Sequence, residues 1–163
     1  EYYVHTLGAL YGTQTVVLRI FNAYGPGQFI PAAHAPVIPL FMWQAIRGAS
    51  LVVFGDGEQT RDFVYIDDVV GALVAAAKAD GVERQTINIG SGQEISINQL
   101  VERIAYTVRR RVEILYNHEE SGGVPRLVAD LATARQKLGF VPRTGLEEGL
   151  QRLLELDPRF SLR

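Results

Sequence analysis

The sequence contains no cysteine and only two lysines, Lys78 and Lys137, among its 163 residues. Without cysteine it can form neither disulfides nor thiolate metal sites, which excludes a secreted disulfide scaffold. The three histidines, His5, His34 and His118, are far apart in the sequence and do not show the paired spacing of metal ligands. A zinc site is therefore not expected, because it needs three or four convergent ligands.

The sequence also lacks a strong excess of charge and long apolar runs. Sixteen Lys and Arg stand against 18 Asp and Glu, for a net charge of −2, so we expect neither nucleic acid nor an anionic membrane as a partner. The one basic run, residues 109–111, is interpreted as the solvated end of a helix. No apolar run reaches the roughly 20 residues of a membrane span, and the first residues do not resemble a signal peptide. These absences predict a soluble protein, which we expect in the cytoplasm.

The hydrophobic residues, 47% of the chain, are enough for one core and follow a mixed α and β pattern. Apolar and β-branched runs predict strands over residues 15–21, 51–54, 63–66, 86–89 and 112–116, with an extended segment at 126–129. Helical periodicity predicts helices over residues 2–10, 37–47, 68–78 and 97–108. Two further helices are expected, one that begins after Asp130 and ends at residue 138, and one that begins at Thr144 and continues to about residue 156. No repeat or clear linker interrupts this order, so we expect a single α/β unit over residues 1–163.

Four polar residues mark expected helix starts. A Ser-x-x-Gln pair begins at Ser96 and a Thr-x-x-Glu pair begins at Thr144, and each predicts a capping box. Asp67 and Asp130 precede helical patterns and are expected to be N-cap residues.

Three stretches of the chain carry motifs that belong together. Residues 18–28 read Leu-Arg-Ile-Phe-Asn-Ala-Tyr-Gly-Pro-Gly-Gln, residues 53–68 read Val-Phe-Gly-Asp-Gly-Glu-Gln-Thr-Arg-Asp-Phe-Val-Tyr-Ile-Asp-Asp, and residues 88–92 read Asn-Ile-Gly-Ser-Gly. In this order and spacing they resemble the extended short-chain dehydrogenase/reductase family, in its nucleotide-sugar epimerase and dehydratase branch. The resemblance covers essentially the whole chain. It implies the C-terminal part of an extended Rossmann-type fold, a UDP- or dTDP-sugar substrate, and NAD as the cofactor of the parent protein.

Two features that the resemblance implies are missing from this sequence. The family holds NAD on a Gly-rich loop after its first strand and uses a Tyr-x-x-x-Lys pair as its base. No such glycine triplet is present, and the residues four before the two lysines are Val74 and Thr133. We therefore expect a part that lacks the Gly-rich N-terminal half and starts just after the key turn of the catalytic helix. Residues 1–28 would end the cofactor domain and residues 29–163 would form the substrate-binding domain, with no catalytic residue and no NAD bound to this chain.

Asn22 and Arg61 are the main candidate substrate-binding residues. Asn22 ends an apolar strand, and ligands of open α/β sheets sit beyond such strand ends; the alternative is that its amide only caps the turn. Arg61 follows a Gly-Asp-Gly turn and is suited to two-pronged phosphate recognition. By the resemblance it contacts the diphosphate, whereas the alternative is a weak surface pair with Asp62 or Glu58.

The resemblance assigns three apolar residues to the same site. Val52 and Phe54 lie on the strand that faces the nucleotide base in this family, although alternate residues of a short strand are usually only packed in a core. Val37 begins the helix that approaches the sugar diphosphate, where a helix N-terminus favours anions.

The last loop departs from the family pattern. Aligned from residues 124–126, the positions of the family's phosphate-binding arginine and ribose-binding aspartate are occupied by Glu120 and Gly123. Arg126 is the candidate substitute for the lost cation, and the departure puts the identity of the nucleotide in doubt.

Two functions from different classes fit these observations. The chain is either the nucleotide-sugar-binding part of an NAD-dependent enzyme or a stand-alone binding or scaffold module with the same fold. In either case the apolar helix and strand at residues 2–21 would expose a strand edge and an apolar face, and such surfaces favour pairing. We therefore expect a homo-oligomer through this segment.

Overall fold

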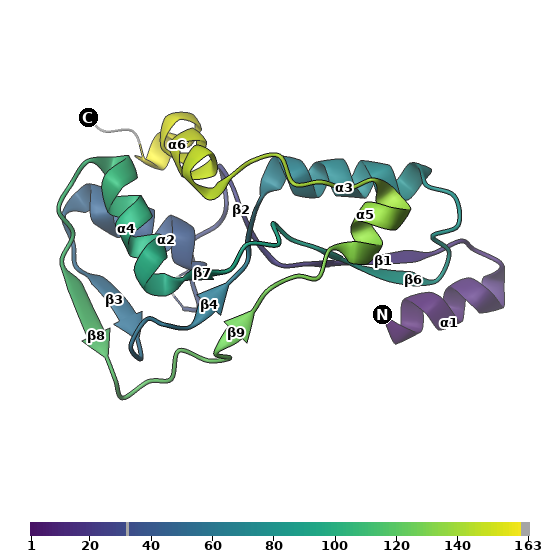
Figure 1. Cartoon of the computed structure of the whole chain (residues 1–163), viewed down its shortest axis with the longest axis horizontal. Coiled ribbons are helices and arrows are strands. Elements are labelled where there is room, and N and C mark those ends of the chain that lie inside the picture. Colours follow the sequence, from purple (N-terminus) through teal and green to yellow (C-terminus); the bar gives the residue numbers. More distant parts are fainter. Residues whose placement is uncertain (32, 161–163) are drawn as a thin grey trace.

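A computed structural model describes residues 1–31 and 33–160, which form two lobes lying side by side (Figure 1). The larger lobe holds helices α2 (Val37–Arg47), α4 (Ile97–Val108), α6 (Leu146–Leu156) and the short 3-10 helix η1 (Pro158–Phe160), with strands β2 (Asn22–Tyr24), β3 (Leu51–Phe54), β4 (Thr60–Arg61), β5 (Phe63–Tyr65), β7 (Ile95–Ser96), β8 (Ile114–Asn117) and β9 (Arg126–Leu127). The smaller lobe holds α1 (Tyr2–Tyr11), β1 (Val16–Ile20), α3 (Ile66–Lys78), β6 (Gln85–Ile89) and α5 (Ala132–Leu138). The α/β class is as the sequence predicts.

The strands form four small sheets, mostly with parallel pairing. β1 pairs with β6, β2 with β5, and β3 with β8, each in parallel. β4 lies between β7, which runs antiparallel to it, and β9, which runs parallel. Two parallel strands must be joined by a long crossover connection, which usually contains a helix. Here helix α3 lies along β1 and β6, and helices α2 and α4 lie beside β3 (Figure 1).

The strand predicted over residues 15–21 is shorter in the structure, where β1 covers Val16–Ile20. After β1 the backbone exchanges its hydrogen-bond partner in the smaller lobe for one in the larger lobe. The amide of Phe21 still donates to the carbonyl of Ile89 at 2.9 Å, whereas the next amide, of Asn22, donates to the carbonyl of Asp62 at 3.2 Å. β1 therefore ends in the smaller lobe and β2 begins in the larger one, which puts Asn22 at the crossing between them.

Each lobe has its own cluster of buried apolar side chains. In the larger lobe α2 packs on α4, and α4 on α6, around the fully buried residues Met42, Leu100, Ile104, Leu150, Leu153 and Phe160. In the smaller lobe Ile87 and Ile89 of β6 pack with Ala72 of α3 and Ala134 of α5. Val16 and Leu18 of β1 pack against this second cluster. The predicted functional division at residue 28 stays a prediction.

Helix α1 lies against the smaller lobe but buries little of itself. It ends at Gly12, whose φ of 65° is the left-handed conformation that glycine adopts readily. Gly8 is its one fully buried residue, and His5 reaches β6 through a 3.1 Å contact with the hydroxyl of Thr86. Its large apolar side chains remain exposed: Tyr2, Tyr3, Val4, Leu7, Leu10 and Tyr11.

The capping box at Ser96 is confirmed. The Ser96 hydroxyl accepts from the amide of Gln99 at 3.1 Å, and the Gln99 carboxamide oxygen accepts from the amide of Ser96 at 3.1 Å. The box predicted at Thr144 is wrong, because α6 starts one residue later with Gly145 as its N-cap. The amide of Thr144 donates instead to the buried carboxylate of Asp68, at 3.0 Å.

The two aspartate caps are also corrected. Helix α3 starts directly after β5, with Tyr65 as its N-cap, so Asp67 lies inside the first turn rather than before it. Leu131 is the N-cap of α5, although Asp130 still accepts a 2.9 Å hydrogen bond from the amide of Ala132. Within residues 1–31 and 33–160, no helix has both the length and the apolar character needed to cross a membrane.

Candidate functional site

A pocket of about 490 Å³ lies between α2, β3 and the loop that follows β8. Five of the six predicted binding residues line it: Asn22, Val37, Val52, Phe54 and Arg61. They come from four different elements, β2, α2, β3 and β4, so their meeting is a property of the fold rather than of the local sequence. Further lining residues come from α2, from Gln59, from Ile97 and from the loop at 121–123.

Strand β3 turns alternate side chains toward the core and toward this pocket. Leu51 and Val53 are 0% and 1% exposed, whereas Val52 and Phe54 are 39% and 43% exposed. Successive side chains of a strand point to opposite faces, and here Val52 and Phe54 are on the open face. The alternative that they are packed core residues is therefore wrong.

Helix α2 supplies the opposite wall with one of its faces. Val37, Leu40, Phe41 and Gln44 line the pocket, and their spacing of three or four residues puts them on one side of a helix. The other side of α2 buries residues such as Met42 and Ala45 in the core. The pocket is therefore walled by apolar side chains with a few polar groups among them, which is typical of small-molecule sites.

Arg61 reaches the pocket with its guanidinium held by backbone carbonyls. Nη1 donates to the carbonyls of Thr60 and Val124, both at 2.7 Å, and Nη2 donates to the carbonyl of Gly122 at 2.9 Å. Among the described residues no carboxylate forms a salt bridge with it. The alternative of a surface pair with Asp62 or Glu58 is therefore wrong, and the cation is left free for an anion.

Asp62 is instead a buried structural carboxylate. Its side chain is 0% exposed, and Oδ1 accepts from the amide and hydroxyl of Ser91 at 2.6 and 2.7 Å. Oδ2 accepts from the amides of Gly92 and Ala129 at 2.9 and 3.1 Å. Asp62 thereby fastens the ends of β6 and β9 to the segment that carries Arg61.

Asn22 is half-buried at the pocket wall. Its Nδ2 donates to the carbonyl of Asp62 at 3.0 Å, forty residues away in the sequence. The side chain therefore bridges β2 to the chain next to β5 rather than capping its own turn.

Arg126 does not line this pocket. Its exposed guanidinium forms a salt bridge with Glu94 at 2.9 Å. The hydroxyl of Thr60 also donates to Glu94, at 2.8 Å, and this bond, together with the Arg126 pair, lowers the pKa of the Glu94 carboxyl. The interaction is a surface pair of the kind that adds little stability.

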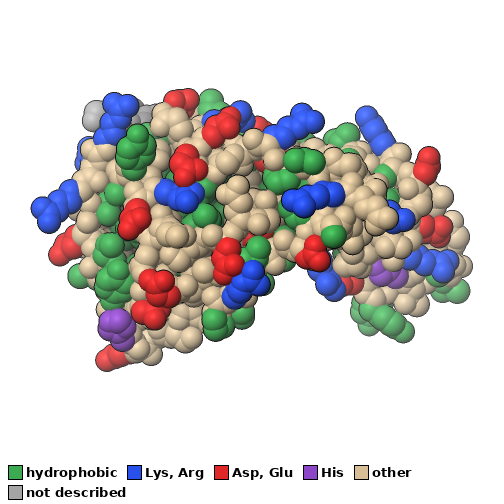
Figure 2. Space-filling view, viewed as in Figure 1, with side chains coloured by type: hydrophobic (Ala, Val, Ile, Leu, Met, Phe, Trp, Pro, Cys, Tyr) green, Lys and Arg blue, Asp and Glu red, His purple; other side chains and the backbone are tan. Residues whose placement is uncertain are grey.

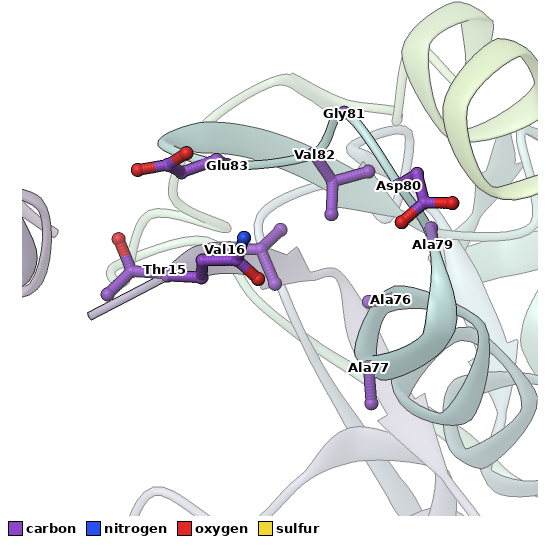
Figure 3. Close-up of a pocket in the computed structure, with 10 residues that line it drawn as sticks. Thr15, Val16, Ala76, Ala77, Ala79, Asp80, Gly81, Val82 and Glu83 are labelled. Carbon is purple, nitrogen blue, oxygen red and sulfur yellow. The ribbon is translucent and has the colours of Figure 1, made fainter. Parts of the chain in front are cut away.

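A second hollow, of about 270 Å³, lies at the far end of the smaller lobe (Figure 3). Figure 3 shows small side chains around it, such as Ala76, Ala77 and Val82, with the carboxylates of Asp80 and Glu83 at its rim. No Lys or Arg is among its lining residues, so this hollow is unsuited to a diphosphate. In Figure 2, acidic and basic side chains are mixed over the visible face of the molecule, without a large patch of one sign.

Comparison with known proteins assigns the family. Residues 1–90 match the model of the "NAD dependent epimerase/dehydratase family". The chain belongs to this family. It is 36% identical over 154 residues to a putative UDP-glucose 4-epimerase of Methanocaldococcus jannaschii, covering 94% of this chain and 49% of that protein. It is 34% identical to a UDP-glucose 4-epimerase of Mycolicibacterium smegmatis, covering 95% and 49%.

Solved structures of the epimerase/dehydratase family have the same fold. The UDP-glucose 4-epimerase of Thermotoga maritima, solved with UDP-glucose, matches with a TM-score of 0.87 at 36% identity, over 94% of this chain and 49% of that one. The UDP-glucuronic acid 4-epimerase of Bacillus cereus, solved with UDP-glucuronic acid and NAD, matches with a TM-score of 0.84 at 27% identity, over 94% and 48%. The chain thus spans about half the length of these relatives.

The described residues do not fit the cofactor after which the epimerase/dehydratase family is named. A dinucleotide pyrophosphate is bound where a strand turns through a Gly-rich loop into a helix. The two direct strand-to-helix junctions of the described chain, Tyr65 to Ile66 and Ser96 to Ile97, contain no glycine. The loop from β2 to α2 contains Gly25 and Gly27, but Ile30 stands where a Gly-x-Gly-x-x-Gly pattern has its third glycine. No step of chemistry is therefore assigned to NAD on these residues.

The pocket also contains residues that the sequence did not single out: Gln44, Gln59, Ser121, Gly122 and Gly123. Gln59 donates to the carbonyl of Phe54 at 2.9 Å and so holds the end of β3. A Cβ on Gly122 would meet the Gln59 carboxamide at 2.5 Å, so a larger residue here would require the Gln59 side chain to move. Such loop contacts bring together residues more than sixty apart and leave no periodic signal.

Proposed function

We propose that this chain is the nucleotide-sugar-binding portion of an NAD-dependent epimerase or dehydratase, with a UDP- or dTDP-sugar as its ligand. One observation carries the proposal: a single pocket gathers Asn22, Val37, Val52, Phe54 and Arg61. Apolar walls and a guanidinium without a carboxylate partner suit a nucleoside diphosphate, because the faces of the base are flat and apolar and the diphosphate is anionic.

The donors of Arg61 leave room for a phosphate. A guanidinium has five N–H groups, and three of them donate to the carbonyls of Thr60, Gly122 and Val124. The remaining two are the Nε–H and one N–H of Nη2. Two donors thus remain for an anion, and arginine commonly forms two hydrogen bonds with a phosphate. The carbonyls therefore hold the fork in place without using it up.

In the parent enzyme this binding would serve catalysis indirectly. Base and diphosphate lie remote from the reacting sugar carbon, and their binding energy would hold that carbon at the nicotinamide. The chain would thus supply substrate affinity and position. The catalytic base and the binding site of the hydride carrier would come from residues that it does not contain. We expect the isolated chain to have no turnover.

The test is titration of the chain with UDP and dTDP at fixed salt. A charge-assisted pair is worth roughly 1.5–3 kcal/mol, so Arg61→Ala should weaken diphosphate binding by about one to two decades. Arg61→Lys should recover only part of the affinity, because an ammonium cannot form the planar fork. Arg109→Ala is the control, since Arg109 lies at the exposed C-terminal end of α4.

Two results would contradict the assignment. Equal losses for Arg61→Ala and Arg109→Ala would mean diffuse attraction of charge rather than a site. No binding of either nucleotide by the unmodified chain would mean that the pocket alone does not recognise a nucleoside diphosphate.

The alternative is a stand-alone binding module that uses the same pocket. Fusion of the chain to the Gly-rich half of a family member separates the two functions. Interconversion of UDP-sugars by the fusion would support an enzyme part, whereas binding without turnover would support the module.

A further inference from the structure

A small hollow of about 150 Å³ lies where helix α6 begins. It is lined by Phe63, Ser91, Gln93, Ile95 and residues 142–146. None of these residues lines the pocket that contains Arg61. Pockets for small organic molecules usually measure about 300–1,000 Å³, so the size of this hollow suits a small ion rather than a nucleotide.

The hydroxyl of Thr144 is a polar group in this hollow that has no partner. Thr144 is 9% exposed, and its amide donates to Asp68, but its hydroxyl forms no hydrogen bond with the described residues. Among these residues the orphaned side-chain atoms that solvent does not reach are on Gln28 and Gln44 alone. The Thr144 oxygen is therefore open to the hollow that Thr144 lines. Buried hydroxyls usually have a partner, and a group bound in the hollow would supply one.

Helix α6 adds backbone donors at the same place. It runs over 11 residues, and its N-cap, Gly145, provides no side-chain cap. The first amides of a helix have no acceptor within the helix and carry the positive end of its dipole. The first of these amides belongs to Leu146, which lines the hollow. The hydroxyl and the helix amides thus surround one space with hydrogen-bond donors.

Arg143 brings a positive charge to the rim of the hollow. Its side chain is exposed, and no carboxylate of the described residues forms a salt bridge with it. The acidic side chains of the surrounding segments, by contrast, all have partners: Asp62 accepts the four bonds described above, Asp68 accepts from the amides of Arg143 and Thr144, Glu147 pairs with Arg103 at 2.7 Å, and Glu148 pairs with Arg152 at 2.6 Å. The charged group that lacks a partner at this hollow is therefore the cation.

We propose that the hollow binds a small oxyanion, with the size and charge of a phosphate group. The Thr144 hydroxyl and the first amides of α6 donate to its oxygens, as in other anion sites at helix N-termini, and Arg143 supplies charge-assisted hydrogen bonds. The segment from α5 to α6 runs from the smaller lobe to the larger one (Figure 1), and Ser91 follows β6 of the smaller lobe. The anion would thus link the two lobes, and it would do so independently of any ligand beside Arg61.

The probe is inorganic phosphate, titrated at fixed ionic strength and followed by the amide signals in NMR spectra. It is added to the unmodified chain and to Arg61→Ala, which excludes a contribution from the 490 Å³ pocket. Arg143→Gln removes the charge at the hollow, and Thr144→Val removes the hydroxyl while keeping the shape. The matched control is Arg135→Gln, because Arg135 is an exposed arginine of α5 that forms no salt bridge within the described chain and lines none of the pockets described above.

Phosphate should shift the amide signals of Gly145, Leu146 and Glu147 in the unmodified chain and in Arg61→Ala alike. Arg143→Gln should weaken this binding about tenfold or more, and Thr144→Val about three- to tenfold. Arg135→Gln should weaken it less than about twofold. Phosphate should also raise the melting temperature of the chain, and this rise should be smaller in Arg143→Gln.

A second titration, with ribose 5-phosphate, distinguishes two sources of the same phosphate group. Shifts of the same signals at equal affinity would support a site for phosphate esters, whereas tighter binding of inorganic phosphate would support a site for the free anion.

Three results would overturn the proposal. Signals at the start of α6 that do not respond to phosphate would mean that no anion binds there. Equal losses for Arg143→Gln and Arg135→Gln would mean diffuse attraction of charge. Full phosphate affinity in Thr144→Val, with only a lower melting temperature, would mean that the hydroxyl has a structural role and does not meet the anion.

Discussion

Replacing Asp62 with asparagine should be among the most destabilising conservative changes in this chain. The carboxylate is fully buried and accepts four hydrogen bonds from Ser91, Gly92 and Ala129. Asparagine keeps the shape but exchanges one oxygen for an NH₂ group. Since each oxygen accepts from at least one backbone N–H, the NH₂ meets a backbone donor in either orientation of the amide.

The magnitude follows from what is lost. A hydrogen bond to a charged group contributes about 1.5–3 kcal/mol, and a buried donor left without a partner costs about 1–3 kcal/mol. Asp62→Asn should therefore lower the free energy of unfolding by about 2–4 kcal/mol. That is a large part of the roughly 5–15 kcal/mol by which domains are usually stable.

Urea denaturation followed by circular dichroism measures this difference. The matched control is Asp67→Asn, because Asp67 is an exposed aspartate with only a 3.3 Å salt bridge to Arg152; we expect a loss below about 1 kcal/mol. If Asp62→Asn unfolds at the same urea concentration as Asp67→Asn, the buried carboxylate does not fasten the strand ends as described.

The remaining predictions concern acid, the cofactor and association. Arg159, with the amide of Gly27, lowers the pKa of Asp157 from 3.8 to about 2. The Asp157 carboxylate should therefore contribute about 2 kcal/mol to the free energy of unfolding above pH 4, and this contribution should be lost as the pH falls toward 2. In an acid titration, Asp157→Asn should lack this part of the loss of stability. Calorimetry should find no binding of NAD in the micromolar range, and activity assays with added NAD should find no turnover of UDP-sugars. Micromolar binding of NAD, or any turnover, would contradict the cofactor interpretation. The exposed face of α1 should drive homo-oligomers, and Leu10→Glu with Tyr11→Glu should give monomers by light scattering; a monomeric unmodified chain at high concentration would refute this.

The sequence predicted best those elements whose stability is local. The bounds of α2 and β3 agree with the structure, because an amphipathic period and a short β-branched run are decided by neighbouring residues. The cap at Ser96 is equally local. The Thr144 cap failed because a distant carboxylate, Asp68, takes the amide that the box would have used. Spacing in the sequence carries no trace of a contact over 76 residues.

The candidate site was predictable only where a family motif marked it. Asn22 and Arg61 stand in such motifs and line one pocket. Gln44 gave no signal, because a glutamine in an amphipathic helix reads as a solvent-facing residue. Only its register, seven residues after Val37, indicates the pocket side. Arg126 was chosen by alignment of a loop, and its partner Glu94 could not be seen from the sequence.

We expect the two separate apolar clusters to behave as two cooperative units. The cluster of the larger lobe and that of the smaller lobe do not share buried residues, and the chain crosses between them where Phe21 and Asn22 change hydrogen-bond partners. Regions with separate cores open with separate free energies, and slow exchange of backbone amides reports them individually. A nucleotide bound to the larger lobe would thus protect the amides of α2 and β3 while leaving the exchange of β1 and β6 nearly unchanged.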